Sequence, residues 1–306
     1  MKILVATEKP FAAAAVNGIR DIVEKNGHEL ALLEKYTDRN QLLAAVADAD
    51  ALIVRSDKVT AEVVAAARNL KIVVRAGAGF DNLDLQACTE RGIVAMNTPG
   101  QNSNAVAELA IAMMIFMSRN KFTPGTGMEI KGKKVGIQAY GNVGRLVAEK
   151  AKALGMDVMA FDPFVPAEKM IEDGVTPAES LEKMYEQCNF ISLHIPAIPA
   201  TIGSINYNLI TRMPKNGCLV NTARKEIINE PELEKVLADR PDLRYVTDVA
   251  AACQAELDEK FPKQVFATPK KMGAETAEAN INAGLAAANQ ICDYFATGCT
   301  KFQLNK

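Results

Sequence analysis

The chain has 306 residues, enough for two compact domains, and a formal net charge of −2 with both signs mixed along its length. This balance argues against nucleic acid or an anionic membrane as the main partner.

The six cysteines form no CxxC pair and only two histidines are present, so no metal site is expected and the thiols are expected to be reduced. The first residues, MKILVATEK, have the pattern of a strand followed by charge, which differs from a signal peptide. No apolar run is long enough to span a bilayer. We therefore expect a soluble cytoplasmic protein.

The first 97 residues alternate between short apolar runs and amphipathic segments, a pattern typical of a parallel sheet with helices on both faces. Strands are predicted at 3–6, 51–54, 72–74 and 93–96, and helices at 12–24, 41–47, 61–68 and 83–91. Pro99-Gly100 marks a break. A nearly all-apolar segment at 105–117 predicts a buried helix, and a polar connector follows at 122–134.

Residues 135–162 have the pattern of a βαβ nucleotide-binding unit. An apolar strand leads to a glycine-bearing turn, an amphipathic helix follows, and a second strand ends on Asp162. Gly141 would let the backbone approach a pyrophosphate at the helix N-terminus, and Gly144 would let the helix pack on the strand. Asp162 would bond the adenosine ribose hydroxyls. The first glycine of the usual fingerprint is replaced by Ala139, which can make this turn if its φ stays negative.

After this unit, further strands are predicted at 189–193, 218–221, 245–248 and 265–267, and a long helix at 274–295. We expect the long helix to pack back on the first domain, because the ends of inserted folds tend to meet. The predicted fold class is α/β, with two Rossmann-like doubly wound parallel-sheet domains. The dinucleotide-binding domain, 98–278, would be inserted into a substrate-binding domain formed by 1–97 and 279–306.

Ligands of open α/β sheets bind beyond the carboxyl ends of the strands, where several charged residues occur here. Arg55 and Arg75 each follow an apolar strand, and two guanidinium groups suit an anionic substrate. Glycines 77 and 79 would offer backbone N–H groups to a carboxylate.

Arg224 ends the sequence LVNTAR after another strand, where a fixed positive charge could orient a 2-keto acid. Lys270 follows Thr-Pro at a strand end; in a closed cleft near arginines it would hold its proton less tightly and could act as general acid or base. For His194 we prefer a structural or cofactor-proximal role over catalysis.

These segments together resemble the D-isomer-specific 2-hydroxyacid dehydrogenases. The similar segments are LIVRSDKVTAEV (52–63), VVRAGAGFDNLDL (73–85), GIVAMNTPGQNSNAVAEL (92–109), KGKKVGIQAYGNVGRLVAEKAKALGMDVMAFDP (131–163), LVNTARKEIINE (219–230) and ATPKKMGAETAEAN (267–280). The resemblance implies NAD as cofactor and hydride transfer from C2 of a 2-hydroxyacid. Among members of the family, the likeness favours those that oxidise 3-phosphoglycerate in serine biosynthesis, as homodimers.

The strand-end positions and the resemblance together give a set of candidate residues. The substrate-binding candidates are Arg55, Ser56, Arg75, Gly77 and Asn102. The cofactor-binding candidates are Ala78, Gly141, Asn142, Val143, Gly144, Asp162, Ile195, Pro196, Thr222, Ala223, Arg224, Asp248, Lys270 and Gly273. The catalytic candidates are Arg224 and Lys270.

The chain departs from the family pattern at several places. Lys270 stands where the family has its catalytic histidine, and Cys253 stands where it has a glutamate; Glu256 is near but out of register. The connector at 119–133 is shorter than in the family, which affects the expected subunit contacts. The C-terminal regulatory domain of longer members has no counterpart, so feedback by serine is not expected.

Two alternatives stay open at this point. One is a glyoxylate or hydroxypyruvate reductase or another D-2-hydroxyacid dehydrogenase. The other, from a different functional class, is an NAD-binding regulator like the corepressors related to this family. Retention of Arg55, Arg75, Arg224 and a protonatable residue at 270 favours an enzyme.

Overall fold

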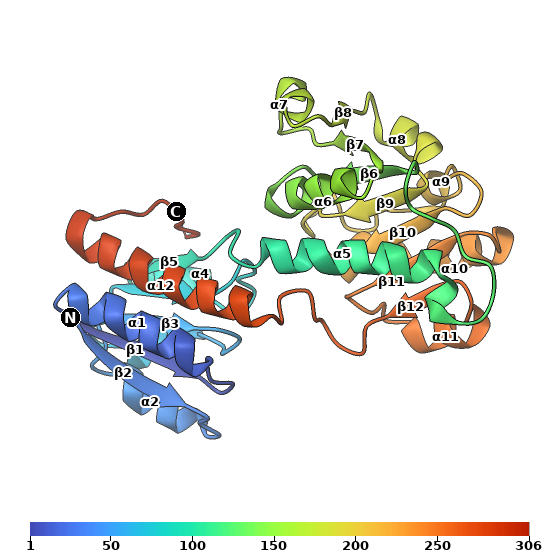
Figure 1. Cartoon of the computed structure of the whole chain (residues 1–306). Helices are drawn as coiled ribbons and strands as arrows, with labels where there is room; N and C mark the ends of the chain where they lie inside the picture. Colours follow the sequence, from blue (N-terminus) through green and yellow to red (C-terminus); the bar gives the residue numbers. More distant parts are fainter. Residues whose placement is uncertain (306) are drawn as a thin grey trace. The chain divides into compact units, whose positions relative to one another are not determined.

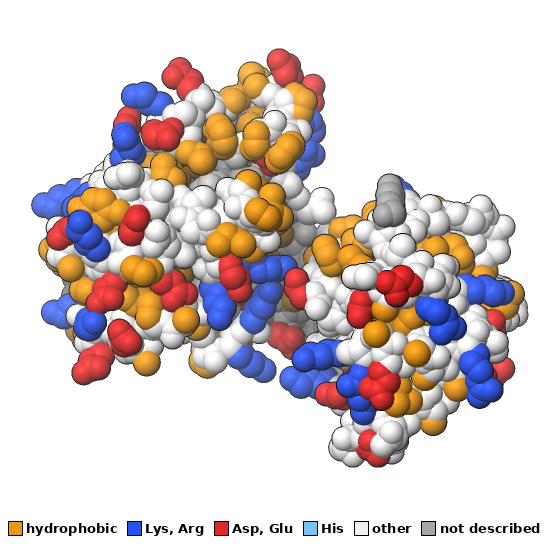
Figure 2. Space-filling view, turned by 180° about the vertical axis from the view of Figure 1, so that it is seen from behind, with side chains coloured by type: hydrophobic (Ala, Val, Ile, Leu, Met, Phe, Trp, Pro, Cys, Tyr) orange, Lys and Arg blue, Asp and Glu red, His pale blue; other side chains and the backbone are white. Residues whose placement is uncertain are grey.

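The computed structural model describes residues 1–305, which form two compact units. One unit contains Met1–Asn102 and the chain from Glu275 onward, and the other contains Ser103–Ala274. The predicted domain boundaries lie at 97/98 and 278/279, close to those of the units. Figure 2 shows positive and negative side chains interspersed with hydrophobic ones on both units.

The first unit is built around a five-stranded parallel sheet in the order β2-β1-β3-β4-β5. Its strands are β1 (Lys2–Thr7), β2 (Glu29–Glu34), β3 (Ala51–Val54), β4 (Ile72–Arg75) and β5 (Val94–Asn97), and its helices are α1 (Ala13–Lys25), α2 (Arg39–Val46), α3 (Ala61–Ala66), α4 (Leu85–Glu90) and α12 (Ala277–Thr297). Because the chain runs from β1 out to β2 and then back to β3, the order reverses between β1 and β3. This is the switch point at which such sheets bind ligands.

Residues of each strand alternate between two apolar layers. In β3, Ala51 and Ile53 join the layer under α1 and α12, whereas Leu52 and Val54 join the layer under α2, α3 and α4. Figure 1 shows α12 lying alongside α1 on one face of this sheet.

The second unit has a seven-stranded parallel sheet in the order β12-β11-β10-β9-β6-β7-β8. Its strands are β6 (Lys134–Gln138), β7 (Asp157–Phe161), β8 (Thr176–Pro177), β9 (Phe190–Leu193), β10 (Cys218–Asn221), β11 (Arg244–Thr247) and β12 (Val265–Ala267). Its helices are α5 (Ser103–Ser118), η1 (Asn120–Phe122), α6 (Asn142–Ala153), α7 (Ala167–Glu172), α8 (Leu181–Gln187), α9 (Tyr207–Ile210), η2 (Lys225–Ile227), α10 (Glu230–Asp239) and α11 (Gln254–Lys260). Its strand order reverses between β6 and β9, so the glycine turn after β6 and the segment after β9 flank the switch point.

The two parallel α/β sheets confirm the predicted fold class. Within residues 1–305, no helix is both long and apolar enough to cross a membrane. In the same part of the chain, no three His, Cys, Asp or Glu side chains are grouped so that they could hold a metal ion.

Candidate functional site

The glycine turn after β6 has the close packing that the sequence predicted. The amide of Ala139 donates to the carbonyl oxygen of Phe161 at 2.9 Å, which places the turn against β7. At Gly144 an added Cβ would lie 2.2 Å from the carbonyl oxygen of Ala139, so the helix can approach the strand only with glycine there.

The N-terminus of α6 is open to an anionic ligand. Among the described residues no side chain caps this helix, and Gly141 and Asn142 are exposed. A Cβ at Gly141 would have no atom within 4 Å, so the space beside this residue is open. The unpaired N–H groups and the positive dipole end of α6 therefore form a site of the kind that binds phosphate groups.

Ala139 departs from the expectation of a negative φ, because its φ is 76°. A left-handed conformation of this kind costs an L-residue about 1–2 kcal/mol. The alanine therefore carries strain that the usual glycine would not.

Replacing this residue, Ala139→Gly, is expected to stabilise the protein by about 0.5–1 kcal/mol. Relief of the left-handed strain exceeds the extra chain entropy of glycine in the unfolded state, which is about 0.4–1 kcal/mol. The buried Ala148 in the interior of α6 gives a matched control, because Ala148→Gly should destabilise by about 1 kcal/mol or more. Denaturant unfolding of both variants checks this, and an equal loss of stability in the two would contradict it.

Asp162, directly after β7, is held in place by two backbone groups. One carboxylate oxygen accepts the N–H of Tyr140 and the other the N–H of Phe164, both at 2.8 Å. Each oxygen keeps a further lone pair. The carboxylate is thus anchored next to the glycine turn and can accept hydrogen bonds from a diol.

The segments after β9 and β10 contribute polar groups to the same edge of the sheet. Ile195 and Pro196 follow β9, and Thr222, Ala223 and Arg224 follow β10. The hydroxyl of Thr222 is buried without a hydrogen-bond partner in the described part of the chain. Because a buried polar group without a partner is costly, this hydroxyl indicates a position where a ligand completes the structure. The guanidinium of Arg224 donates to the carbonyl oxygen of Ala223 at 2.9 Å.

Asp248, directly after β11, holds the loop that carries Lys270 by hydrogen bonds. Its buried carboxylate accepts the hydroxyl of Thr268 at 2.8 Å and the N–H groups of Met272 at 2.7 Å and Gly273 at 2.8 Å. These bonds close the loop that carries Lys270, whose side chain is exposed. Asp248 therefore shapes the Lys270 loop.

Cys253, which stands where the family has a glutamate, lies beside a carboxylate that comes from α10. The carboxylate of Glu230 accepts the N–H groups of Ala252 at 2.9 Å and Cys253 at 3.3 Å. Burial, reinforced by this carboxylate, raises the pKa of Cys253 to about 11. Glu256 instead faces Lys260 at 3.8 Å. No sequence pattern relates positions 230 and 253, so only the fold shows this contact.

His194 follows β9 at the switch point. Its Nε2 lies 2.9 Å from the hydroxyl of Ser192, and its backbone N–H donates to Gln138. Burial lowers the pKa of His194 from its ordinary 6.5 to about 3, so the imidazole is neutral at neutral pH. This supports the structural or cofactor-proximal role over proton transfer.

The neutral imidazole makes stability depend on pH. Between about pH 6.5 and 3 the unfolded chain binds a proton at residue 194 that the folded protein does not, so stability is lost as the pH falls through this range. The slope is at most about 1.4 kcal/mol per pH unit, and less because the side chain is only partly covered. The difference in unfolding free energy between pH 7 and 4 should be smaller for His194→Gln than for wild type. An equal difference would contradict the assignment.

In the first unit, Arg55 and Arg75 lie at the ends of neighbouring strands, because Val54 of β3 pairs with Arg75 of β4. The Arg55 guanidinium donates to the carbonyl oxygens of Lys9 and Pro10 at 3.4 Å and to the Asn280 side chain. The Arg75 Nε donates to the carbonyl oxygen of Arg55 at 3.0 Å. The two cations are thus fixed together at the carboxyl edge of the sheet.

The expectation for Gly77 was wrong in one respect. Its N–H donates to the hydroxyl of Thr98 at 2.6 Å and the residue is buried, so it does not offer this group to a substrate. Its φ is 147°, and a Cβ there would lie 1.6 Å from Arg75 Nη1. Gly77 therefore makes room for the Arg75 guanidinium.

The remaining candidates lie near these residues or at the end of the unit. Ser56 is exposed directly after Arg55, and Asn102 is partly exposed at the last position of the segment. The carbonyl oxygen of Ala78 accepts the side-chain amide of Asn97 at 2.6 Å.

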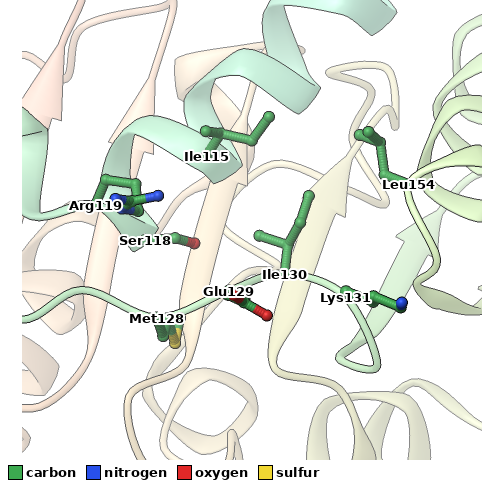
Figure 3. Close-up of a pocket in the computed structure, with 8 residues that line it drawn as sticks. All are labelled: Ile115, Ser118, Arg119, Met128, Glu129, Ile130, Lys131 and Leu154. Carbon is green, nitrogen blue, oxygen red and sulfur yellow. The ribbon is translucent and has the colours of Figure 1, made fainter.

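The connector at 119–133 borders a cavity of about 280 Å³ in the second unit (Figure 3). The residues that line it are Ile115, Ser118, Arg119, Met128, Glu129, Ile130, Lys131 and Leu154. Residues 130 and 131 precede β6, and residue 154 follows α6, so the cavity lies toward the amino end of β6. It is therefore separate from the glycine turn.

A comparison with protein families matches residues 9–305 to the family described as D-isomer specific 2-hydroxyacid dehydrogenase, catalytic domain. The chain belongs to this family. The resemblance predicted from the sequence is thereby confirmed.

Several known proteins are similar to this chain. A curated D-3-phosphoglycerate dehydrogenase of Methanocaldococcus jannaschii is 35% identical over 83% of this chain and 51% of its own length. A hydroxypyruvate reductase of Thermotoga maritima is 35% identical over 87% of this chain and 91% of its own. The crystal structure of an NAD⁺-bound 3-phosphoglycerate dehydrogenase of Entamoeba histolytica is 50% identical, with a TM-score of 0.89 over 100% of this chain and 99% of that one. The chain spans about half the length of the curated phosphoglycerate dehydrogenases it matches.

Proposed function

We propose that this chain is an NAD-dependent oxidoreductase that oxidises D-3-phosphoglycerate to 3-phosphohydroxypyruvate, a step of serine biosynthesis. The observation that carries the proposal is the pair of arginines fixed at the ends of β3 and β4, which suits an anionic group such as the phosphate of a small substrate. The Entamoeba histolytica enzyme, similar over the whole chain, supports it. A cytoplasmic homodimer is the form that the family resemblance predicts.

The residues of the second unit fit a nicotinamide dinucleotide. The open N-terminus of α6 would hold the pyrophosphate, Asp162 the adenosine ribose, and the unpaired Thr222 hydroxyl another polar group of the ligand. When bound, NAD supplies the acceptor for the hydride that leaves C2. The protein's own residues then have to bind the substrate anions and move one proton.

We assign these tasks to four side chains. Arg55 and Arg75 would hold the phosphate, and Arg224 would orient the carboxylate and favour negative charge developing on the C2 oxygen. Lys270 would take the proton from the C2 hydroxyl as the hydride leaves, and would return it in the reverse direction. The retention of the three arginines, together with a protonatable residue at 270, favours an enzyme over an NAD-binding regulator.

Hydroxypyruvate reduction is a second candidate, because the Thermotoga maritima reductase matches this chain over nearly its full length. Steady-state turnover of 3-phosphoglycerate, glycerate and 2-hydroxyglutarate with NAD separates the two. We expect the highest kcat/KM with 3-phosphoglycerate. A preference for glycerate, whose oxidation is the reverse of hydroxypyruvate reduction, would assign the chain to the second class.

The cofactor should be NAD and not NADP. Asp162 would face a 2′-phosphate with like charge, and the following residues Pro163, Phe164 and Val165 provide no cation to neutralise it. A desolvated clash of this kind costs several kcal/mol, on the order of a hundredfold or more in affinity. The measurement is kcat/KM with each cofactor at saturating substrate, and equal values for the two would contradict the assignment.

A further inference from the structure

Asn221, the last residue of β10, makes a set of buried hydrogen bonds to the turn that carries Arg224. The residue is 0% exposed in the middle of the seven-stranded sheet. Its side-chain oxygen accepts the N–H of Ala223 at 3.0 Å, and its side-chain amide donates to the carbonyl oxygen of Arg224 at 2.9 Å. The same amide lies 3.5 Å from the hydroxyl of Tyr245 on the neighbouring strand.

The backbone of Asn221 is fixed as well. Its carbonyl oxygen accepts the N–H of Asp248 and the hydroxyl of Thr247, both at 3.0 Å. The side chain is thus presented from a rigid position, and its donor and its acceptor both bind the turn directly after the strand. Hydrogen bonds in a buried network of this kind are strong when every group is satisfied, and they select one geometry of the backbone.

We propose that Asn221 is a positioning residue for the reaction: its amide fixes the direction in which Arg224 leaves β10 and the conformation of Thr222 and Ala223. The inference rests on the proposed function of Arg224. Orientation of a catalytic group matters because a displacement of about 1 Å can cost on the order of a hundredfold in rate. A serine or an alanine at 221 could not bond both Ala223 and Arg224 from the same place.

The substitution Asn221→Asp removes the donor and introduces a buried carboxyl group, a change that Gln264→Glu repeats elsewhere in the same unit. The side chain keeps its shape and the acceptor for Ala223, but places an oxygen opposite the carbonyl oxygen of Arg224. We expect kcat to fall by about 10–100-fold, with a smaller change in KM, because a misplaced Arg224 guanidinium would stabilise the transition state less well. Tyr245→Phe removes only the long bond and should stay within about threefold of wild type.

Gln264→Glu is the matched control for the loss of a buried amide. The Gln264 side chain donates to the carbonyl oxygens of Leu237, Arg240 and Leu243 at the amino end of β12. Its replacement should lower the thermal midpoint but leave kcat of the folded enzyme within about twofold. If Gln264→Glu lowered kcat as much as Asn221→Asp, the effect would be general destabilisation and the proposal would be overturned.

A double-mutant cycle shows whether Asn221 acts through Arg224. In the background of Arg224→Ala, Asn221→Asp should lower kcat by less than about threefold, because the group it positions is gone. A loss of 10–100-fold in both backgrounds would overturn the proposal. The cycle can be measured with any 2-hydroxyacid that the wild type oxidises, so a wrong substrate assignment leaves it intact.

If the wild type oxidised no 2-hydroxyacid, the proposed function would fail. The effect of Asn221 on Thr222 and Ala223 could then still be tested through the affinity of the protein for NADH. A titration of NADH fluorescence should then show binding weakened about 5–10-fold by Asn221→Asp and unchanged by Gln264→Glu. Unchanged affinity in Asn221→Asp, or the absence of NADH binding to wild type, would overturn it.

Discussion

Lys270→Met is expected to lower kcat by about 10²–10⁴-fold while leaving NAD binding nearly intact. Oxidation of a 2-hydroxyl needs a base at the oxygen while the hydride leaves the carbon, and an arginine cannot serve because it does not deprotonate in proteins. His194 lies after β9 as a neutral, hydrogen-bonded imidazole. Lys270 lies on a loop anchored by Asp248, where its side chain is exposed.

The pH dependence separates proton transfer from a merely electrostatic effect of the lysine. We expect Lys270→Met to change the dependence of kcat on pH, because the variant lacks the group that would take the proton from the C2 hydroxyl. The measurements are kcat against pH and an NADH titration for each variant. A variant within tenfold of wild type that keeps the same pH dependence would exclude Lys270 and return attention to His194.

The adjacent lysine gives the sharpest comparison. Lys271→Met removes the same charge one residue later in the same loop, so a larger loss there than in Lys270→Met would move the proton-transfer role to Lys271. Lys270→His should recover little activity, because no carboxylate occupies position 253. In the double variant Lys270→His with Cys253→Glu, the new glutamate should support the histidine less well than the corresponding glutamate does in a family member. Glu230 already lies beside position 253, and the two carboxylates would repel each other.

Removal of either strand-end arginine is expected to weaken binding of the phosphorylated substrate. Arg55→Ala or Arg75→Ala should raise KM for 3-phosphoglycerate by about 30–150-fold, corresponding to about 2–3 kcal/mol for a lost charge-assisted hydrogen bond. The effect on glycerate should be much smaller. Arg75→Ala should have an additional effect through Arg55, because the Arg75 Nε holds the carbonyl oxygen of that residue.

The exposed Arg68 provides the control for a change in the net charge of the same unit. Arg68→Ala removes one positive charge away from the carboxyl edge of the sheet and should leave KM within about twofold. If both Arg55→Ala and Arg75→Ala also kept a normal KM, the phosphate would be bound elsewhere and the substrate assignment would have to be abandoned.

The sequence predicted the parts of the fold that depend on local patterns. The βαβ unit at 135–162 was recognisable because apolar periodicity, glycines and a terminal acid follow one another within a short segment. The strand β2 was missed because ELALLE lies at the edge of its sheet, is only partly buried and contains residues that favour helices.

The errors at the site arise from contacts between distant segments. Gly77 was expected to offer its N–H to the substrate, but this N–H donates to Thr98, and the Arg75 guanidinium lies where a side chain of residue 77 would be. The carboxylate of Glu230 beside Cys253 and the left-handed φ of Ala139 depend on how separate elements pack. Strand-end position could therefore indicate candidate residues for the site, but not which partners each side chain would find.

The discontinuous first unit has a consequence for synthesis on the ribosome. Helix α12 comes from the last part of the chain, yet Ala283, Ala287 and Ile291 of this helix complete the apolar layer that covers α1 and one face of the five-stranded sheet. The chain segment for the seven-stranded unit is continuous and can fold as soon as it has emerged. The first unit therefore cannot complete this apolar layer until α12 has left the ribosomal exit tunnel. Until then, the apolar side chains of the sheet and of α1 that pack against α12 stay exposed to water.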